Sequence, residues 1–235
     1  MFKFLLILPG LLAGSLYAQN LVPNPSFESY QQIPCSWNTV ASEFSQYTDA
    51  WYIPANTSTD IHNTHASPGC WANPLTVSDG SDCRLGTQQP HSGDVMAGIY
   101  TIVSSHVWHE YLQVKLTKPL IPGQHYCVEM WVSAADNVAL VSNNIGMYFS
   151  VDPIRGEDQI TGVMPQINAE NVIRDSKGWT LIGGSFIAET AAEYLTIGNF
   201  FSDKDTKTEP MGGNGFCSDG AYYYIDDVVV MLCPV

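Results

Sequence analysis

The 235-residue chain carries 23 acidic and 9 basic side chains, a formal charge of −14 at pH 7, and only 14% of its residues are charged. Hydrophobic residues make up 45% of the chain, enough to build a sizeable core, so wholesale disorder is excluded. Nine scattered basic residues cannot neutralise a phosphate backbone, which excludes nucleic-acid binding and disfavours anionic membranes. Neutral polyols and divalent cations remain as ligands.

The first 18 residues have the three-part build of a secretory signal peptide. Lys3 precedes an apolar stretch from Phe4 to Leu12, and small residues lead to Ala18. We expect cleavage after Ala18, which leaves one domain over residues 19–235. Because no later segment is long and apolar enough to span a bilayer as a helix, we expect the mature chain to be exported to the periplasm, the cell surface or the medium.

From Val95 onward, short segments rich in β-branched and aromatic residues alternate with Gly, Pro, Asn and Asp, a pattern typical of strands. The dipeptide Pro122-Gly123 favours a tight turn between two of them, and helical periodicity is weak throughout. The expected strands are Val95–Ile102, Trp108–Leu116, His125–Ala134, Ile145–Val151, Trp179–Ala188, Tyr194–Phe201 and Tyr222–Leu232. We therefore predict an all-β fold, an antiparallel two-sheet β-sandwich with long disulfide-pinned loops.

Two segments, Ile145–Ser150 and Ile197–Ser202, share the pattern I-G-x-aromatic-F-S. We expect each to start a strand at an equivalent place in the two halves of the sandwich. Chance similarity of two buried strands is the alternative, since one pair of matches does not make a repeat protein.

Six cysteines lie in the mature chain, an even number that favours disulfides in an exported protein. The candidates are Cys35, Cys70, Cys83, Cys127, Cys217 and Cys233. Cys70 and Cys83 flank a loop rich in Pro, Gly and Ser, so a local bridge between them is the first expectation. No C-x-x-C pair occurs, which argues against a zinc ribbon or a redox site.

The two ends of the mature chain carry a recognisable pair of motifs. The chain opens with N-L-V-P-N-P-S-F-E, ending at Glu28, and closes with Y-I-D-D-V, which contains Asp226 and Asp227. This pairing resembles the galactose-binding-like jelly rolls, a group that includes many carbohydrate-binding modules. The resemblance implies that the first and last strands are neighbours and that a structural Ca²⁺ clamps the three carboxylates, which would otherwise repel one another. A solvated or donor-paired acidic cluster is the alternative.

A larger part of the chain resembles a family of exported domains common in Bacteroidota. The matching segments are residues 20–28, 91–100, 109–136, 143–150, 178–186 and 193–201. In that family the domain often precedes an OmpA-like peptidoglycan-binding domain or belongs to cell-surface, gliding or type IX secretion proteins. No OmpA-like segment follows the last expected strand here, so the resemblance does not imply wall anchoring.

Glycan sites combine an exposed aromatic ring, which stacks on the apolar face of a sugar, with polar groups that bond its hydroxyls. The segment 41–92 is too long for an ordinary connection, and such segments are usually functional or disordered. The ligand-binding candidates in it are Trp51, Tyr52 and Trp71, with Asn56, Asn73 and His91 as polar contacts. Each ring either plugs the sandwich or faces solvent as a platform, whereas Trp131 and Trp179 are expected in the core.

The sequence shows no constellation typical of catalysis. The segment around His106-x-x-His109 reads as extended β structure, in which residues three apart point to opposite faces and cannot bind one metal ion together. There is no G-x-S-x-G elbow. We therefore expect a non-catalytic exported module that binds carbohydrate or cell-wall glycan. The alternatives are a structural subunit of an outer-membrane, gliding or type IX secretion complex and, third, a glycoside hydrolase that uses paired acids.

Overall fold

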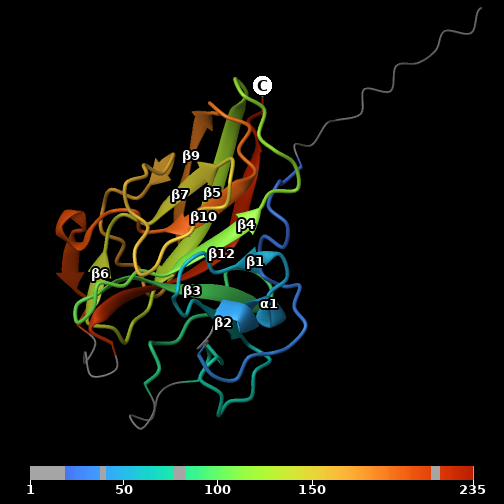
Figure 1. The fold of residues 1–235 in the computed structure, drawn as a ribbon. Helices are drawn as coiled ribbons and strands as arrows, with labels where there is room; N and C mark the ends of the chain where they lie inside the picture. The colour runs from blue at the N-terminus through green and yellow to red at the C-terminus, as the bar shows by residue number, and fades with distance from the viewer. Residues whose placement is uncertain (1–18, 38–40, 77–82, 213–217, 235) are drawn as a thin grey trace, which may run out of the picture.

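Two five-stranded antiparallel sheets pack face to face in the computed structural model (Figure 1), which describes residues 19–37, 41–76, 83–212 and 218–234. The first sheet has the strand order β1-β4-β10-β7-β8 and the second the order β2-β3-β12-β5-β9. A short ribbon pairs β11 with β6. The expected signal peptide, residues 1–18, and Cys217 lie outside the described residues.

The strands of the first sheet are β1 (Trp51–Tyr52), β4 (Tyr111–Lys115), β10 (Tyr194–Gly198), β7 (Gly146–Ser150) and β8 (Ile167–Asn168). Those of the second sheet are β2 (Asp60–Asn63), β3 (Val95–Val103), β12 (Gly220–Leu232), β5 (His125–Ala134) and β9 (Thr180–Ile187). The ribbon consists of β6 (Leu140–Ser142) and β11 (Thr208–Pro210), and the helical turns are η1 (Ala41–Glu43), α1 (Phe44–Tyr47) and η2 (Asp203–Asp205). No helix in the described part of the chain is long and apolar enough to cross a membrane.

The predicted antiparallel two-sheet β-sandwich is confirmed, and each segment expected to be a strand overlaps one. The strands that sequence reasoning missed are β1, β2, β6, β8 and β11, each of four residues or fewer. Segments this short do not alternate for long enough to reveal a strand.

One apolar core fills the space between the sheets. Along β5 every second side chain faces inward, so Val128, Met130 and Val132 are buried against Leu195 and Ile197 of the opposite sheet. Smaller apolar clusters lie on the two outer faces, where long segments cover them. Both outer faces of the sandwich are therefore partly covered by loops.

The two segments that share a sequence pattern do not occupy equivalent places in two halves of the sandwich. They form β7 and β10, which are neighbours in the same sheet and pair antiparallel, with Gly146 opposite Gly198 and Met147 opposite Ile197. Strand β10 ends at Gly198, where the second copy of the pattern was expected to begin a strand. The expectation of equivalent places in two halves is therefore wrong.

The described disulfides join Cys35 to Cys70 and Cys127 to Cys233. The expected bridge between Cys70 and Cys83 is wrong, since exposed Cys83 has no disulfide partner among the described residues. The backbone N–H of Ala72 donates to the carbonyl of Cys35 at 3.2 Å, which holds the early segment against the Cys70 loop. Cys70 therefore pairs with a cysteine that the fold brings near it and not with Cys83, which is closer in the sequence.

The beginning of the described chain runs beside the last strand, as the terminal motifs predicted. Leu21 donates its backbone N–H to Val230 at 2.7 Å. The Asn20 side chain donates to the carbonyl of Val228 and accepts from the N–H of Val230, both at 2.9 Å. In Figure 1 the blue N-terminal segment accordingly lies along the molecule beside the red β12. The first described residues are thus hydrogen-bonded to the last strand of the second sheet.

Candidate functional site

Glu28 and Asp226, which come from the two ends of the described chain, accept hydrogen bonds from the same turn, Ser92–Val95. Glu28 Oε1 accepts the backbone N–H groups of Asp94 and Val95, both at 2.8 Å, and Asp226 Oδ2 accepts that of Ser92 at 3.0 Å. Gly93 lies between these donors with φ +60°, and a Cβ there would overlap the Glu28 carboxylate. The structure therefore brings Glu28 and Asp226 together around the same turn.

Asp227 is held by three donors. It accepts hydrogen bonds from the hydroxyls of Ser26 and Ser92 and from Nδ1 of His91. Although burial acts to raise the pKa of Asp227, these hydrogen bonds lower it below its usual value. The His91 ring stacks on Trp131 with 4.2 Å between ring centroids. His91 thus positions the Asp227 carboxylate instead of joining the other expected ligand-binding residues.

The expected calcium site has its carboxylates in place but not arranged as a cage. Burial raises the pKa of Asp226 to about 8, and the charge of Asp227 acts in the same direction. In the described part of the chain, no group of three or more His, Cys, Asp or Glu side chains is arranged to hold a metal ion. The carboxylates instead accept N–H and O–H donors, and calcium binding by Glu28, Asp226 and Asp227 stays a prediction.

Trp51 does not form an exposed platform. It is 1% exposed in the core, packs on Phe27 with 5.1 Å between centroids, and donates Nε1–H to the carbonyl of Asn24 at 2.9 Å. The reason is the alternation of a strand: Trp51 faces the core, so its neighbour Tyr52 faces outward.

The two asparagines have different environments. Asn73 is buried, and its side chain donates to the carbonyl of Ala66 at 2.6 Å and accepts from the N–H of Leu75 at 2.9 Å. Asn73 therefore builds a turn and is buried away from a ligand. Asn56 is exposed, and its backbone N–H bonds the carbonyl of Glu157 at 3.0 Å.

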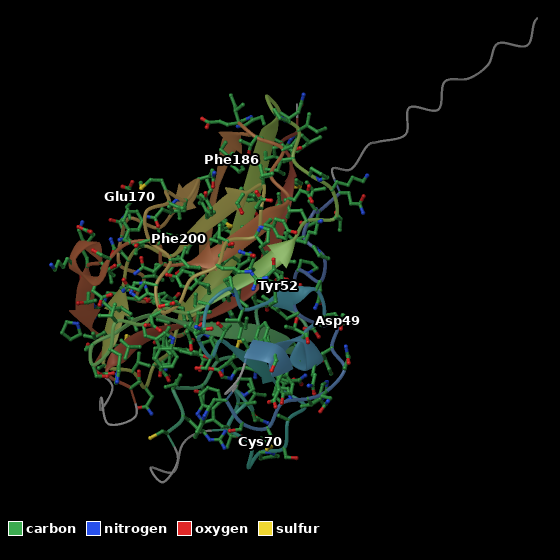
Figure 2. All side chains as sticks on the ribbon, viewed as in Figure 1. Asp49, Tyr52, Cys70, Glu170, Phe186 and Phe200 are labelled. Carbon is green, nitrogen blue, oxygen red and sulfur yellow. A yellow bond between two sulfur atoms is a disulfide. The ribbon has the colours of Figure 1, made fainter. Side chains whose placement is uncertain are left out.

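Trp71 belongs to a separate aromatic cluster on the other side of the molecule. Its ring lies against buried His62 with 5.1 Å between centroids and meets Trp37 edge-on at 6.0 Å. Trp37 is 53% exposed, and the Cys35–Cys70 disulfide braces this loop. Figure 2 labels Cys70 at the lower end of the molecule, well away from Tyr52. The six expected ligand-binding residues therefore do not form one site.

Tyr52 instead belongs to a row of side chains across the outer face of the first sheet. Strand register places Tyr52 opposite Gln113, Gln113 opposite Thr196, and Thr196 opposite Tyr148. The Tyr52 hydroxyl donates to Gln113 Oε1 at 2.6 Å, and Gln113 Nε2 donates to Thr196 Oγ1 at 2.6 Å. Burial raises the pKa of Tyr52 to about 12, so its hydroxyl stays neutral.

A second row lies beside the first, with Lys115 opposite Tyr194 and Tyr194 opposite Ser150. Lys115 Nζ lies 5.5 Å from the centre of the Tyr194 ring and 2.9 Å from the Glu193 carboxylate. We call the two rows together the tyrosine face, which consists of Tyr52, Gln113, Lys115, Tyr148, Tyr194 and Thr196. Its three rings are half-buried, so each keeps part of its surface open to solvent.

A loop covers one side of the tyrosine face. The carbonyl of Ile154 accepts from Gln113 Nε2 at 3.3 Å, and the N–H of Ile160 donates to the Tyr111 hydroxyl at 2.9 Å. Gln113 and Thr196 are fully buried beneath this cover, whereas Lys115 is exposed. The accessible part of the face is therefore made by the rings and by Lys115.

Sequence reasoning found Tyr52 but missed the rest of the tyrosine face. Lys115, Tyr148 and Tyr194 lie at alternating positions of strands that were correctly expected, and this alternation is the signal that they share one side of each strand. Which strands are neighbours decides whether these side chains meet, and the order of strands is not readable from the sequence.

Comparison with known proteins gives a likeness of fold only. No family model and no curated protein matches the chain. A solved structure of the Stig cyclase Fisc from Fischerella sp. TAU aligns with TM-score 0.50 and 11% identity over 93% of this chain and 99% of that one. At this identity the likeness extends to the fold and fixes no activity.

Two further solved structures are similar at lower scores. The CBM22-1 xylan-binding domain of Paenibacillus barcinonensis Xyn10C aligns with TM-score 0.46 and 13% identity over 89% of this chain and 92% of that domain. The K3 cleaved adhesin domain of Lys-gingipain from Porphyromonas gingivalis aligns with TM-score 0.41 and 16% identity over 91% of this chain and 98% of that domain.

Proposed function

We propose that the protein is a non-catalytic carbohydrate-binding module and that the tyrosine face is its glycan-binding surface. The observation that carries this proposal is the cross-strand register, which puts Tyr52, Tyr148 and Tyr194 on one outer face of neighbouring strands. With strands roughly 4.8 Å apart, Tyr52 and Tyr148 lie roughly 14 Å apart across the sheet. Gln113 and Thr196 between them are buried beneath the loop, so a sugar can contact the face only at its rings and at Lys115.

The chemistry of the face suits a neutral sugar chain. Tyrosine rings offer flat apolar surface for the C–H face of a sugar, and their hydroxyls can donate to or accept from sugar hydroxyls. Tyr52 donates its hydroxyl to Gln113, and Gln113 donates to Thr196. These bonds fix the orientation of the Tyr52 ring before a ligand arrives, which reduces the entropy lost on binding. Exposed Lys115 supplies a polar group beside the Tyr194 ring.

Affinity electrophoresis of the mature chain tests the proposal, with soluble xylan or mixed-linkage glucan in the gel and a pull-down on insoluble peptidoglycan. We expect Tyr52→Ala and Tyr194→Ala each to weaken binding about tenfold, the loss of one stacking contact. Trp37→Ala removes an exposed ring from the other aromatic cluster and serves as the matched control. The proposal would be contradicted if the wild type bound none of these glycans. Loss of binding in Trp37→Ala, with binding kept in the two tyrosine variants, would also contradict it.

We also propose that the chain is exported, cleaved after Ala18 and active at the cell surface or in the periplasm. The two described disulfides support an oxidising compartment. N-terminal sequencing of protein recovered from the source cells should begin at Gln19. A chain that retains Met1 in a reducing cytoplasm would contradict this part of the proposal.

A further inference from the structure

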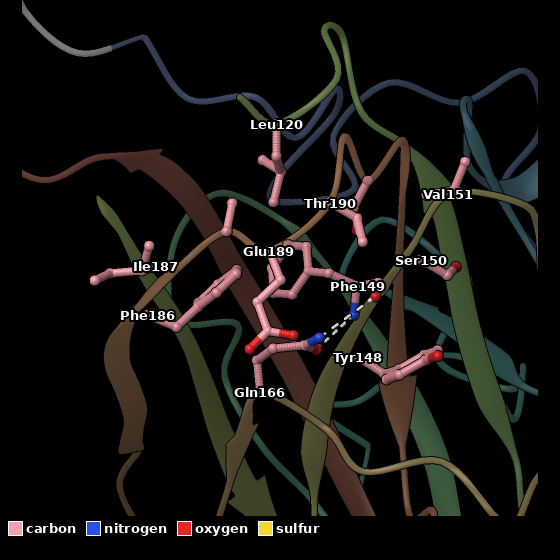
Figure 3. Close-up of a pocket in the computed structure, with 12 residues that line it drawn as sticks. Leu120, Tyr148, Phe149, Ser150, Val151, Gln166, Phe186, Ile187, Glu189 and Thr190 are labelled. Carbon is pink, nitrogen blue, oxygen red and sulfur yellow. Dashed lines mark hydrogen bonds between the residues drawn. The ribbon is translucent and has the colours of Figure 1, made fainter. Parts of the chain in front are cut away.

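A cavity of about 690 Å³ opens at the edge of the sandwich, between β7 of the first sheet and β9 of the second (Figure 3). Its floor is apolar, because the rings of Phe149 and Phe186 meet there with 4.9 Å between centroids beside Leu120. Glu189 is the one charged side chain among the described residues that line it. The cavity thus combines an apolar floor with a single negative charge.

The strand beside this cavity lacks a full partner. Strand β8 pairs with β7 only at Gly146 and Met147. Beyond that point the side-chain amide of Gln166 takes the place of a neighbouring strand. Its Oε1 accepts from the N–H of Phe149 at 2.8 Å, and its Nε2 donates to the carbonyl of Phe149 at 3.5 Å, as the dashed lines in Figure 3 show.

These two bonds have the pattern that the backbone N–H and C=O of one residue of an antiparallel strand would make with Phe149. Gln166 is exposed, so its side chain can swing away without opening the core. Glu189 lines the same cavity as Gln166, and Figure 3 labels both side chains, so the cavity at this pairing position carries a negative charge.

The rim of the cavity is apolar and exposed. Val151 and Ile187 line the cavity and are 45% and 62% exposed. Ile121, 56% exposed, belongs to the neighbouring turn, which is tied to this rim by the hydrogen bond from Gly123 to Ala188 at 2.8 Å. Exposed apolar side chains gathered around an open cavity are typical of an interaction surface.

We propose that this edge cavity binds an extended polypeptide segment of a partner protein, which adds to β7 at Phe149 in place of the Gln166 amide. The bonds that Gln166 now makes call for a main-chain donor and acceptor, the floor formed by Phe149 and Phe186 accepts an apolar side chain, and Glu189 attracts a basic one. Addition of a strand to an open sheet edge is an established mode of peptide recognition. The formal charge of −14 favours a basic segment further.

Fluorescence anisotropy tests this with a labelled hexapeptide, acetyl-Thr-Val-Arg-Val-Thr-Val-amide, added to the folded, disulfide-bonded mature chain. We expect Gln166→Ala to bind the peptide about threefold more tightly, because the competing amide is gone. Glu189→Gln should bind it about threefold more weakly, because the partner of the arginine is lost. Glu170→Gln, an exposed acid outside this cavity, is the matched control and should bind like the wild type.

A second peptide with methylated backbone nitrogens keeps the side chains but cannot pair as a strand, and it should not bind. Hydrogen exchange of the Phe149 amide should be faster in Gln166→Ala and slower when the first peptide is present. No binding of the first peptide to either the wild type or Gln166→Ala at millimolar concentration would overturn the proposal. Equal binding of the methylated peptide would also overturn it and would indicate a cavity for small apolar molecules.

Discussion

Glu28 and Asp226, from opposite ends of the described chain, both accept backbone hydrogen bonds from the segment Ser92–Val95. This segment leads directly into β3, which pairs with β12, the strand that carries Asp226. One turn therefore links the N-terminal segment to the two central strands of the second sheet. Substitutions in the turn should be felt by the whole sandwich.

Gly93→Ala should destabilise the protein more than Gly123→Ala does. Both glycines have a positive φ, at +60° and +83°, so both variants carry backbone strain of about 1 kcal/mol. A Cβ at position 123 meets open space, whereas one at position 93 overlaps the Glu28 carboxylate. Urea unfolding gives the free energy of unfolding of each variant. The extra loss in Gly93→Ala over Gly123→Ala measures the cost of the overlap with Glu28.

A double-mutant cycle then identifies the carboxylate as the cause. Gly93→Ala in a Glu28→Ala background should cost less free energy of unfolding than Gly93→Ala alone, because the overlap is gone. If the alanine variants at positions 93 and 123 lose the same free energy of unfolding, the overlap with the Glu28 carboxylate has no cost and the prediction is wrong.

Calcium at about 10 mM, above the weakest affinities of extracellular calcium modules, should raise the Tm of the mature chain. The buried Asp226, whose pKa is raised to about 8, would gain a neutralising partner beside Glu28 and Asp227. Asp226→Asn should abolish most of the rise, and Mg²⁺ should not reproduce it. A Tm that neither calcium nor a chelator changes would favour the donor-paired arrangement of the three carboxylates.

Stability should be highest at mildly acidic pH. Burial raises the pKa of Glu110 from 4.5 to about 7, so the folded state holds a proton that the unfolded chain has lost, and stability falls as the pH rises from 4.5 to 7. Asp226 acts in the same direction between 3.8 and about 8. Burial lowers the pKa of His62 from 6.5 to about 3, so stability is also lost as the pH falls below 6.5.

Glu110→Gln isolates one of these contributions. The carboxylate accepts from the N–H of Tyr100 and from the hydroxyl and backbone N–H of Ser58. The glutamine can accept from Tyr100 and donate to the Ser58 hydroxyl, which replaces two of these bonds. We expect the variant to be more stable than the wild type at pH 8, on the order of 2 kcal/mol, with little difference at pH 4.5. Urea unfolding across this pH range measures it, and parallel curves would show that Glu110 does not titrate with folding.

The two disulfides should differ in their contribution to stability. Cys127 and Cys233 are 106 residues apart and Cys35 and Cys70 are 35 apart, so the first bridge constrains a longer loop of the unfolded chain. Replacing the Cys127–Cys233 pair with alanine should cost about 1 kcal/mol more than replacing the other pair. Peptide mapping without reduction should join Cys35 to Cys70, and a peptide linking Cys70 to Cys83 would contradict the observed pairing.

The sequence by itself determined the fold class, the positions of the long strands and the closeness of the two chain ends. Alternation of apolar and polar residues is a local pattern, so segments such as His125–Ala134 reveal a strand without reference to their partners. The terminal motifs placed Glu28 near Asp226 by resemblance to known jelly rolls, and the shared turn bears out that closeness.

Only the tertiary structure decided which side chains meet. The order of strands brings Tyr52 and Tyr148 into one row, and the approach of an early segment pairs Cys35 with Cys70. Whether Trp51 or Tyr52 faced solvent depended on which side of a two-residue strand met the core. These outcomes depend on contacts between residues far apart in the chain, and local sequence patterns carry no record of such contacts.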